Sequence, residues 1–195
     1  RFTSTAGALH VASTGLVPIK PTSIAGSGVT LGADGKVSFT GATTISANGC
    51  FTGDFTNYLI SGEFTASSGA CIPWIRLRAA GTDSSGNNYG YVQSESVAAA
   101  TTVASSGATA NMRLSRDLST TVLGALQIRL FAPQLARPTR FYLENVTGSG
   151  TASGSVHMLD AAGYHDLSTA YDGFTVFPSA GNVGGYFMIF GYNEN

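Results

Sequence analysis

The chain has 195 residues, a formal net charge of −1 and only 11% charged residues, against roughly 25% in an average soluble domain. So few charges disfavour long solvated helices, and a near-neutral chain has no basic field to attract nucleic acid or an anionic membrane. Apolar runs stay far below the ~18 residues of a membrane span. We therefore expect one domain with a real core, with neither nucleic-acid binding nor membrane insertion.

The first 28 residues differ from the rest of the chain. RFTSTAGALHVASTGL (1–16) is small and polar and has no charged-then-apolar signal segment. GLVPIKPTSIAGSG (15–28) carries two prolines three residues apart, which predicts an extended, unpaired stretch. We therefore divide the chain into a stalk or lead-in, residues 1–28, and a folded domain, residues 29–195.

The remainder predicts many short strands. In chain order they cover 36–49, 57–66, 72–80, 124–133, 140–148, 154–160, 171–178 and 184–193. Turn-forming residues fill the intervening loops at 82–90, 104–111, 147–154 and 178–185. One segment, 97–105, could be helical, but its Thr and Val content argues against it. The pattern predicts an all-β, antiparallel, jelly-roll-like β-sandwich of about eight to nine strands with an extended N-terminal lead-in.

Two segments repeat one spacing of aromatic residues. DFTNYLI (54–60) and AYDGFTV (170–176) share the order aromatic, aromatic, aliphatic at the same intervals. We interpret each as a corner that leads into an alternating strand, one in each sheet. In the second, Tyr171 and Phe174 would anchor the corner, Asp172-Gly173 would form the turn, and Pro178 would end the strand.

The two cysteines, Cys50 and Cys71, form neither a CxxC motif nor a four-ligand zinc set. Two reduced cysteines buried on strands are the favoured interpretation. A single disulfide remains open if the strands that carry them are neighbours.

One group of titratable residues could bind a metal or act as an acid/base pair. Its members are His157, Asp160, His165, Asp166 and Asp172. The group lacks an i,i+2 His pair, and aspartates in a corner commonly cap backbone amides, so we interpret it as structural. We expect replacement of His165 to have little effect on fold or binding.

Other catalytic signatures are missing from the sequence. It contains neither a G-x-S-x-G elbow nor a phosphate-binding loop, and its acids are dispersed singly. We therefore predict a protein that is not an enzyme, with no cofactor, no metal and no catalytic residue.

Binding is the remaining chemistry, and two places could supply it. Alternation puts Trp74, Arg76 and Arg78 on one face of a strand, with Gln127 and Arg129 expected on a neighbouring strand. Arginine beside an aromatic ring can stack on a sugar or grip a carboxylate. The alternative is a solvated face, or one paired with acids of another subunit.

The second candidate is the loop GNNYGY (86–91). Here Asn87 and Asn88 offer amides, and Tyr89 and Tyr91, if exposed, offer ring faces to a saccharide. An ordinary turn is the alternative for this loop.

Five segments spread over most of residues 15–195 carry a resemblance to a known family: GLVPIKPTSI, FTGDFTNYLI, RLRAAGTDSSGNNYGY, STAYDGFTVFP and GYFMIFGYNEN. They resemble structural proteins of tailed bacteriophages, the minor tail and tail-fibre proteins common in phages of actinobacteria. The resemblance implies a virion β-sandwich, homotrimeric, at the end of a longer fibre and active in host attachment. These segments are framework, so the resemblance transfers no functional residue.

The resemblance also implies the partners and the location. The partners would be further copies of the chain, other virion tail proteins, and a glycan or another envelope component of the host surface. The protein would be assembled in the reducing host cytoplasm, consistent with free cysteines, and would end in the phage particle. Two alternatives are kept: a capsid decoration or head-fibre protein without a ligand, and a secreted carbohydrate-binding module.

Overall fold

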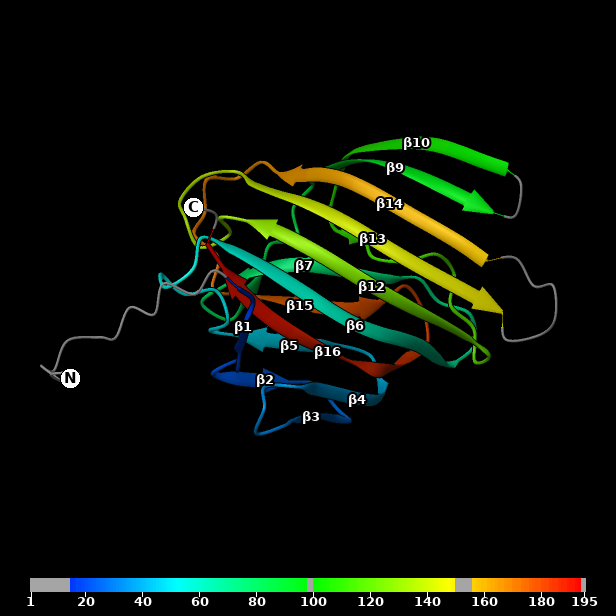
Figure 1. The fold of residues 1–195 in the computed structure, drawn as a ribbon, viewed down its shortest axis with the longest axis horizontal. Helices are drawn as coiled ribbons and strands as arrows, with labels where there is room; N and C mark the ends of the chain where they lie inside the picture. The colour runs from blue at the N-terminus through cyan, green and yellow to red at the C-terminus, as the bar shows by residue number, and fades with distance from the viewer. Residues whose placement is uncertain (1–14, 98–99, 150–155, 194–195) are drawn as a thin grey trace, which may run out of the picture.

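The computed structural model describes residues 15–97, 100–149 and 156–193, and in these ranges every regular element is a β-strand. The strands form two antiparallel sheets, of ten and six strands, that pack face to face (Figure 1). The predicted all-β sandwich is confirmed. The described ranges contain no helix that could cross a membrane.

The larger sheet lies in front in Figure 1. Its strands follow the spatial order β10 (Ala100–Thr109), β9 (Tyr89–Val97), β14 (Val156–His165), β13 (Thr139–Ser149), β12 (Val122–Phe131), β6 (Asn57–Ser68), β16 (Asn182–Tyr192), β4 (Val37–Ala42) and β3 (Val29–Leu31). The short strand β1 (Val17–Ile19) also pairs with β16.

The smaller sheet lies behind the larger one. Its strands follow the order β11 (Met112–Arg113), β7 (Pro73–Ala79), β15 (Gly173–Pro178), β5 (Ile45–Asn48) and β2 (Ser23–Ala25). A two-residue strand, β8 (Thr82–Asp83), pairs with the end of β7.

Each of the eight predicted segments contains a strand, and 36–49 contains both β4 and β5, but the described ranges hold sixteen strands in total. The largest omission is the pair β9 and β10, since residues 104–109 had been predicted as loop. Nearly every residue of β10 is exposed. A strand with water on both faces needs no apolar alternation. Because a sequence predicts a strand through this alternation, β10 carries no such signal.

The prediction that residues 15–28 are unpaired is wrong. Strand β1 pairs with β16 of the larger sheet, and β2 pairs with β5 of the smaller one. Pro18 is tolerated because β1 has a single neighbour, so the missing N–H can face away from the sheet. Residues 17–19 and 23–25, on the N-terminal side of the expected boundary at residue 28, are therefore paired with strands of the sandwich. Residues 1–14 of the predicted lead-in lie outside the described ranges.

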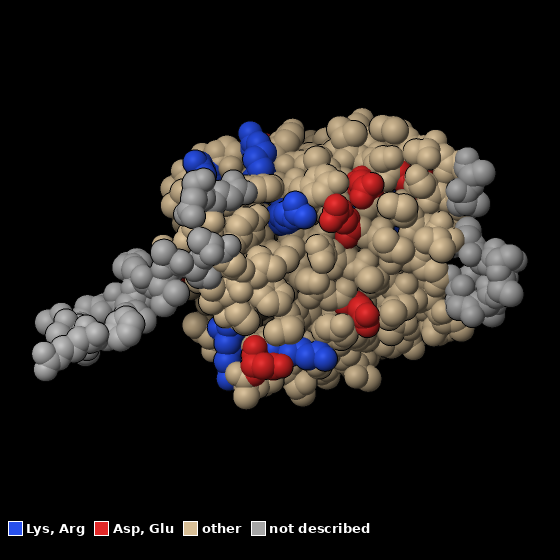
Figure 2. All heavy atoms as spheres, viewed as in Figure 1, with Lys and Arg blue, Asp and Glu red and all other residues tan. Residues whose placement is uncertain are grey.

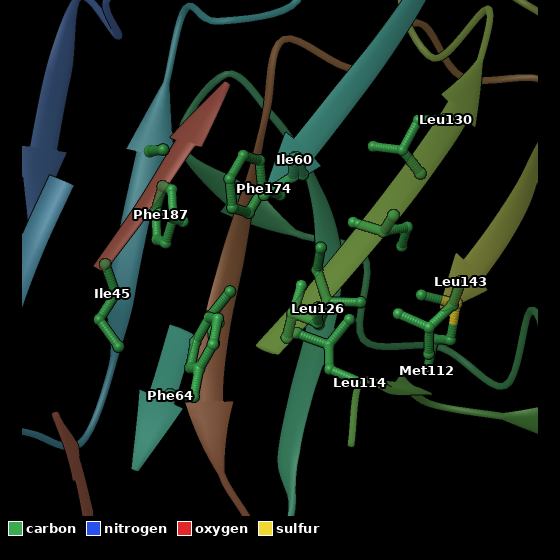
Figure 3. Packing of buried hydrophobic residues seen from close by; sticks show 14 of the residues in the cluster. Ile45, Ile60, Phe64, Met112, Leu114, Leu126, Leu130, Leu143, Phe174 and Phe187 are labelled. Atoms are coloured by element: carbon green, nitrogen blue, oxygen red, sulfur yellow. The ribbon is translucent and has the colours of Figure 1, made fainter. Parts of the chain in front are cut away.

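The core fills the space between the sheets with side chains from both (Figure 3). Phe174 of the smaller sheet lies against Phe187 of the larger one, with ring centroids 5.3 Å apart. Leu126, Ile128 and Leu130 of β12 all point into this core and are buried.

The repeated aromatic spacing does mark a corner before a strand of each sheet. In the first, the Tyr58 hydroxyl accepts a hydrogen bond from the Thr52 amide at 2.7 Å and donates one to the Thr52 carbonyl at 2.6 Å. In the second, β15 ends at Pro178 as predicted. The reason for Gly173 differs from the expected turn: a Cβ there would lie 2.1 Å from the Ala47 carbonyl oxygen. Close approach of β5 therefore requires this glycine.

Candidate functional site

The outer face of the smaller sheet carries the first predicted group. Along β7, Ile75 and Leu77 point into the core, whereas Trp74, Arg76 and Arg78 lie on the opposite face and are partly exposed. The predicted division of this strand into two faces is therefore confirmed. Its cause is the two-residue period of a strand with one buried face.

An aromatic pair occupies this face. Trp74 stands directly opposite Phe177 of β15, and both side chains are half-buried. On the other side of Trp74, the opposing residue is Arg113 of β11. Two partly exposed rings on neighbouring strands give a flat apolar surface with polar groups around it, which suits the face of a sugar ring.

Arg76 lies over the Phe177 ring of this pair. Its guanidinium carbon is 4.5 Å from the centroid of the Phe177 ring, and its Nε donates a hydrogen bond of 3.0 Å to the Ala110 carbonyl. Among the described residues, its two terminal nitrogens have no hydrogen-bond or ion-pair partner. The group is thus held in place with donors still available.

Arg78 has a different role from the one predicted. It forms an ion pair with Asp83 and donates to the Gly81 carbonyl, to Asn48 Oδ1 at 3.0 Å and to Thr175 Oγ1 at 2.8 Å. These contacts engage all three guanidinium nitrogens. Arg78 therefore links β7 to β5, β8 and β15, and its donors serve the protein itself.

Gln127 and Arg129 are not beside this group. They lie on β12, on the outer face of the larger sheet, so the expectation that they neighbour β7 is wrong. Alternation shows which residues of a strand share a face but not which sheet the strand joins. Phe177 and Arg113, the actual neighbours of Trp74, could not be found from the sequence for the same reason.

The loop at 86–91 offers less than predicted. Asn87 is exposed and Asn88 half-buried, but Tyr89 is 2% exposed, so the expected exposure of this tyrosine is wrong. Its hydroxyl accepts a hydrogen bond from the Leu77 amide at 2.8 Å. Tyr91 is half-buried and packs against the core. Both tyrosines belong to β9, where residues 89 and 91 point inward.

His165 is fully buried between Tyr89 and Tyr171. Its Nε2 lies 2.8 Å from Ser84 Oγ, and its Nδ1 lies 3.2 Å from the Tyr171 hydroxyl. Burial lowers the pKa of His165, and the charge of Asp166 opposes this only in part. These contacts revise the prediction that replacing His165 would leave the fold unaffected.

Apart from Asp166, which follows His165 in the chain, the other residues of the predicted titratable group have partners elsewhere in the structure. His157 contacts Arg116, Asp160 lies on the larger sheet opposite Glu144, Asp166 is exposed, and Asp172 accepts a hydrogen bond from the backbone of the turn after β7. In the described ranges, no three His, Cys, Asp or Glu side chains come close enough to hold a metal ion. Cys50 and Cys71 are buried and free.

The outer face of the larger sheet contains a shallow groove of about 360 Å³ that the sequence did not indicate. Its polar lining is Ser61, Glu63, Gln127, Glu144 and Tyr186, from four different strands. Few charged side chains appear on this face in Figure 2. A surface composed by four strands far apart in the chain leaves no local motif, so no sequence pattern could have identified it.

The chain matches no protein-family model, no curated protein and no solved structure.

Proposed function

We propose that the chain is a jelly-roll-like structural and receptor-binding domain of a phage tail, located at the tip of a tail fibre or in a minor tail protein. It acts without catalysis and attaches the particle to a glycan of the host surface. The observation that carries this proposal is the Trp74–Phe177 pair on the outer face of the smaller sheet, with the guanidinium of Arg76 over the Phe177 ring.

The resemblance to tail proteins supports the scaffold part of the proposal. FTGDFTNYLI (51–60) contains the Tyr58 corner, and STAYDGF (168–174) leads into β15 through the buried residues Tyr171 and Phe174. Both segments therefore have a structural role in the sandwich, in keeping with a resemblance that concerns framework rather than chemistry.

The exposed aromatic pair supports the binding part. Saccharides present apolar ring faces and many hydroxyls, and proteins bind them with aromatic surfaces beside planar hydrogen-bonding groups. Trp74 and Phe177 supply the aromatic surface, and Arg76 supplies donors.

Exposed apolar residues on the larger sheet support self-association. Val146 and Met158 oppose each other, and both Leu123 and Val156 oppose Gly148, so the four apolar side chains lie together. The four side chains are 45–61% exposed, with Val146 the lowest and Val156 the highest. In a homotrimer, neighbouring copies would cover them. Light scattering should give three chain masses, and a monomer would contradict this part of the proposal.

Co-sedimentation with purified bacterial cell walls tests the attachment function. Wild type should pellet with walls of a susceptible host, and Trp74→Ala should bind at least about tenfold more weakly, because a central aromatic contact contributes more than 1 kcal/mol. Tyr142→Ala, a half-buried aromatic on the outer face of the other sheet, is the matched control and should bind like wild type. Equal binding by Trp74→Ala and wild type would refute the proposal that this surface binds the cell wall.

Two other roles remain distinguishable. A capsid decoration protein without a ligand would be found in virions but would pellet with no cell wall. A secreted carbohydrate-binding module would pellet with polysaccharide but be absent from purified virions, which mass spectrometry of the particles would reveal.

A further inference from the structure

The arginines on the outer face of the smaller sheet differ in how they are neutralised. Arg78 is paired with Asp83, and Arg113 Nη1 lies 3.8 Å from Glu95 Oε2. Arg76, between them on the sheet, has no carboxylate within ion-pair distance in the described part of the chain. Among the described residues, Arg76 is therefore the arginine of this face that lacks an ion-pair partner.

The position of Arg76 is fixed by contacts that leave its outer end available. Its Nε donates a hydrogen bond of 3.0 Å to the Ala110 carbonyl, and its guanidinium carbon lies 4.5 Å from the centroid of the Phe177 ring. Within the described ranges neither terminal nitrogen has a protein acceptor, so both can donate to a ligand. A guanidinium that is already oriented loses less entropy on binding and can offer two parallel N–H groups to a carboxylate or phosphate.

We propose that this surface binds an acidic saccharide, with the anionic group on the terminal nitrogens of Arg76 and the sugar ring against Trp74 and Phe177. This inference rests on the attachment function proposed above and specifies its ligand class. The anionic group is a carboxylate, as in a uronic acid, or a phosphate diester, as in a polyol phosphate; both have paired oxygens that fit the guanidinium.

Because the protein is almost neutral overall, a preference for acidic polymers would indicate a local binding site. At a net charge of −1 the chain as a whole does not attract a polyanion, so a preference for acidic polymers has to come from a local site. A contact at the surface is screened by salt, and the preference should shrink as ionic strength rises toward 1 M, where the Debye length is about 3 Å.

The test compares three immobilised polymers: polygalacturonate, phosphate-substituted dextran and unmodified dextran. Wild type should bind at least one of the acidic polymers about tenfold or more tightly than dextran, the factor expected for one charge-assisted hydrogen-bonded pair. Arg76→Gln should abolish this difference. Arg76→Lys, which keeps the charge but loses the planar pair of donors, should fall between the two.

The matched control is Arg129→Gln. Arg129 is exposed on the larger sheet with its guanidinium 6.0 Å from the Tyr142 ring, so this change removes the same charge from a similar setting. It should bind like wild type. Thermal melting of each variant checks that the fold is intact.

Each remaining outcome has a defined meaning. Binding to one acidic polymer identifies carboxylate or phosphate as the recognised group. Equal losses in Arg76→Gln and Arg129→Gln, or equal binding to dextran and both acidic polymers, would overturn the inference. If wild type binds cell walls but neither acidic polymer, the inference fails while the attachment function stands; if it binds no cell wall either, both fail.

Discussion

The Nε2 atom of His165 lies 2.8 Å from the Oγ of Ser84, inside a buried group that includes Tyr89 and Tyr171. His165 ends β14 of the larger sheet, and Ser84 follows β8 of the smaller one. The contact therefore ties the two sheets together at one end of the sandwich. A buried imidazole held in this way is stable when neutral, which makes the tie sensitive to pH.

Stability should fall on mild acidification because of His165. Burial lowers its pKa in the folded protein below the ordinary 6.5, so the unfolded chain takes up the proton first as pH falls. The contribution of neutral His165 to the free energy of unfolding is fully present above about pH 6.5. It is lost as the pH falls from there through the folded-state pKa. Urea unfolding between pH 5 and pH 7, above the range where most carboxylates titrate, should show this loss.

His165→Gln should remove this part of the pH dependence and also lower stability at pH 7. His157→Gln, which alters a histidine on the same strand, should leave it in place. A wild-type unfolding free energy that stays level between pH 7 and pH 5 would contradict the account of the buried group.

Phe174→Ala should destabilise the fold by about 3–5 kcal/mol, since the side chain is 0% exposed and packs against Phe51 and Phe187. Phe174→Leu keeps most of the volume and should cost clearly less. Chemical denaturation of both variants measures the difference. A Phe174→Ala loss below about 1 kcal/mol, typical of surface positions, would show that the two sheets do not meet at this ring.

Gly173→Ala should be costly although glycine-to-alanine changes often stabilise a protein. Its Cβ would lie 2.1 Å from the Ala47 carbonyl oxygen, so β5 and β15 would have to separate. The expected loss is about 1–3 kcal/mol or more. Gly53→Ala is the control, because nothing lies within 4 Å of its added Cβ, and its melting temperature should stay near that of wild type. Similar melting temperatures for both variants would argue against the close approach.

The two thiols should be unreactive in the folded protein. Both are buried, and burial raises the pKa of Cys50 and of Cys71. The thiolate that reacts with disulfide reagents is therefore scarce at neutral pH. Ellman's reagent should label neither in native protein and both in denaturant. Rapid labelling of either in the native state would disagree with the described core.

The sequence allowed the two faces of β7 and β12 to be predicted, because one face of each strand is buried. The β7 residues Trp74 and Ile75 illustrate this, since a two-residue period alone assigns them to opposite faces. The buried corners could be found as well, because an aromatic spacing repeats in both sheets.

The pairing order of the strands could not be predicted. Arg129 was expected on a strand next to Trp74, but the two residues belong to different sheets. The residue opposite Trp74 on the neighbouring strand β15 is Phe177. Strand order depends on contacts between residues far apart in the chain, which a single sequence does not encode locally. Tyr89 shows the same limit: its glycine- and asparagine-rich surroundings predict a loop, but pairing with β14 turns its ring into the core.

The fluorescence of Trp74 offers the most direct test of the proposed attachment surface, because this is the single tryptophan of the chain. Solubilised cell-wall polysaccharide that binds the protein should change its emission in a saturable way, with the same midpoint as binding measured by sedimentation. Asn87→Ala should leave this response unchanged. Binding that saturates in sedimentation while the Trp74 emission stays constant would place the ligand elsewhere and contradict the account.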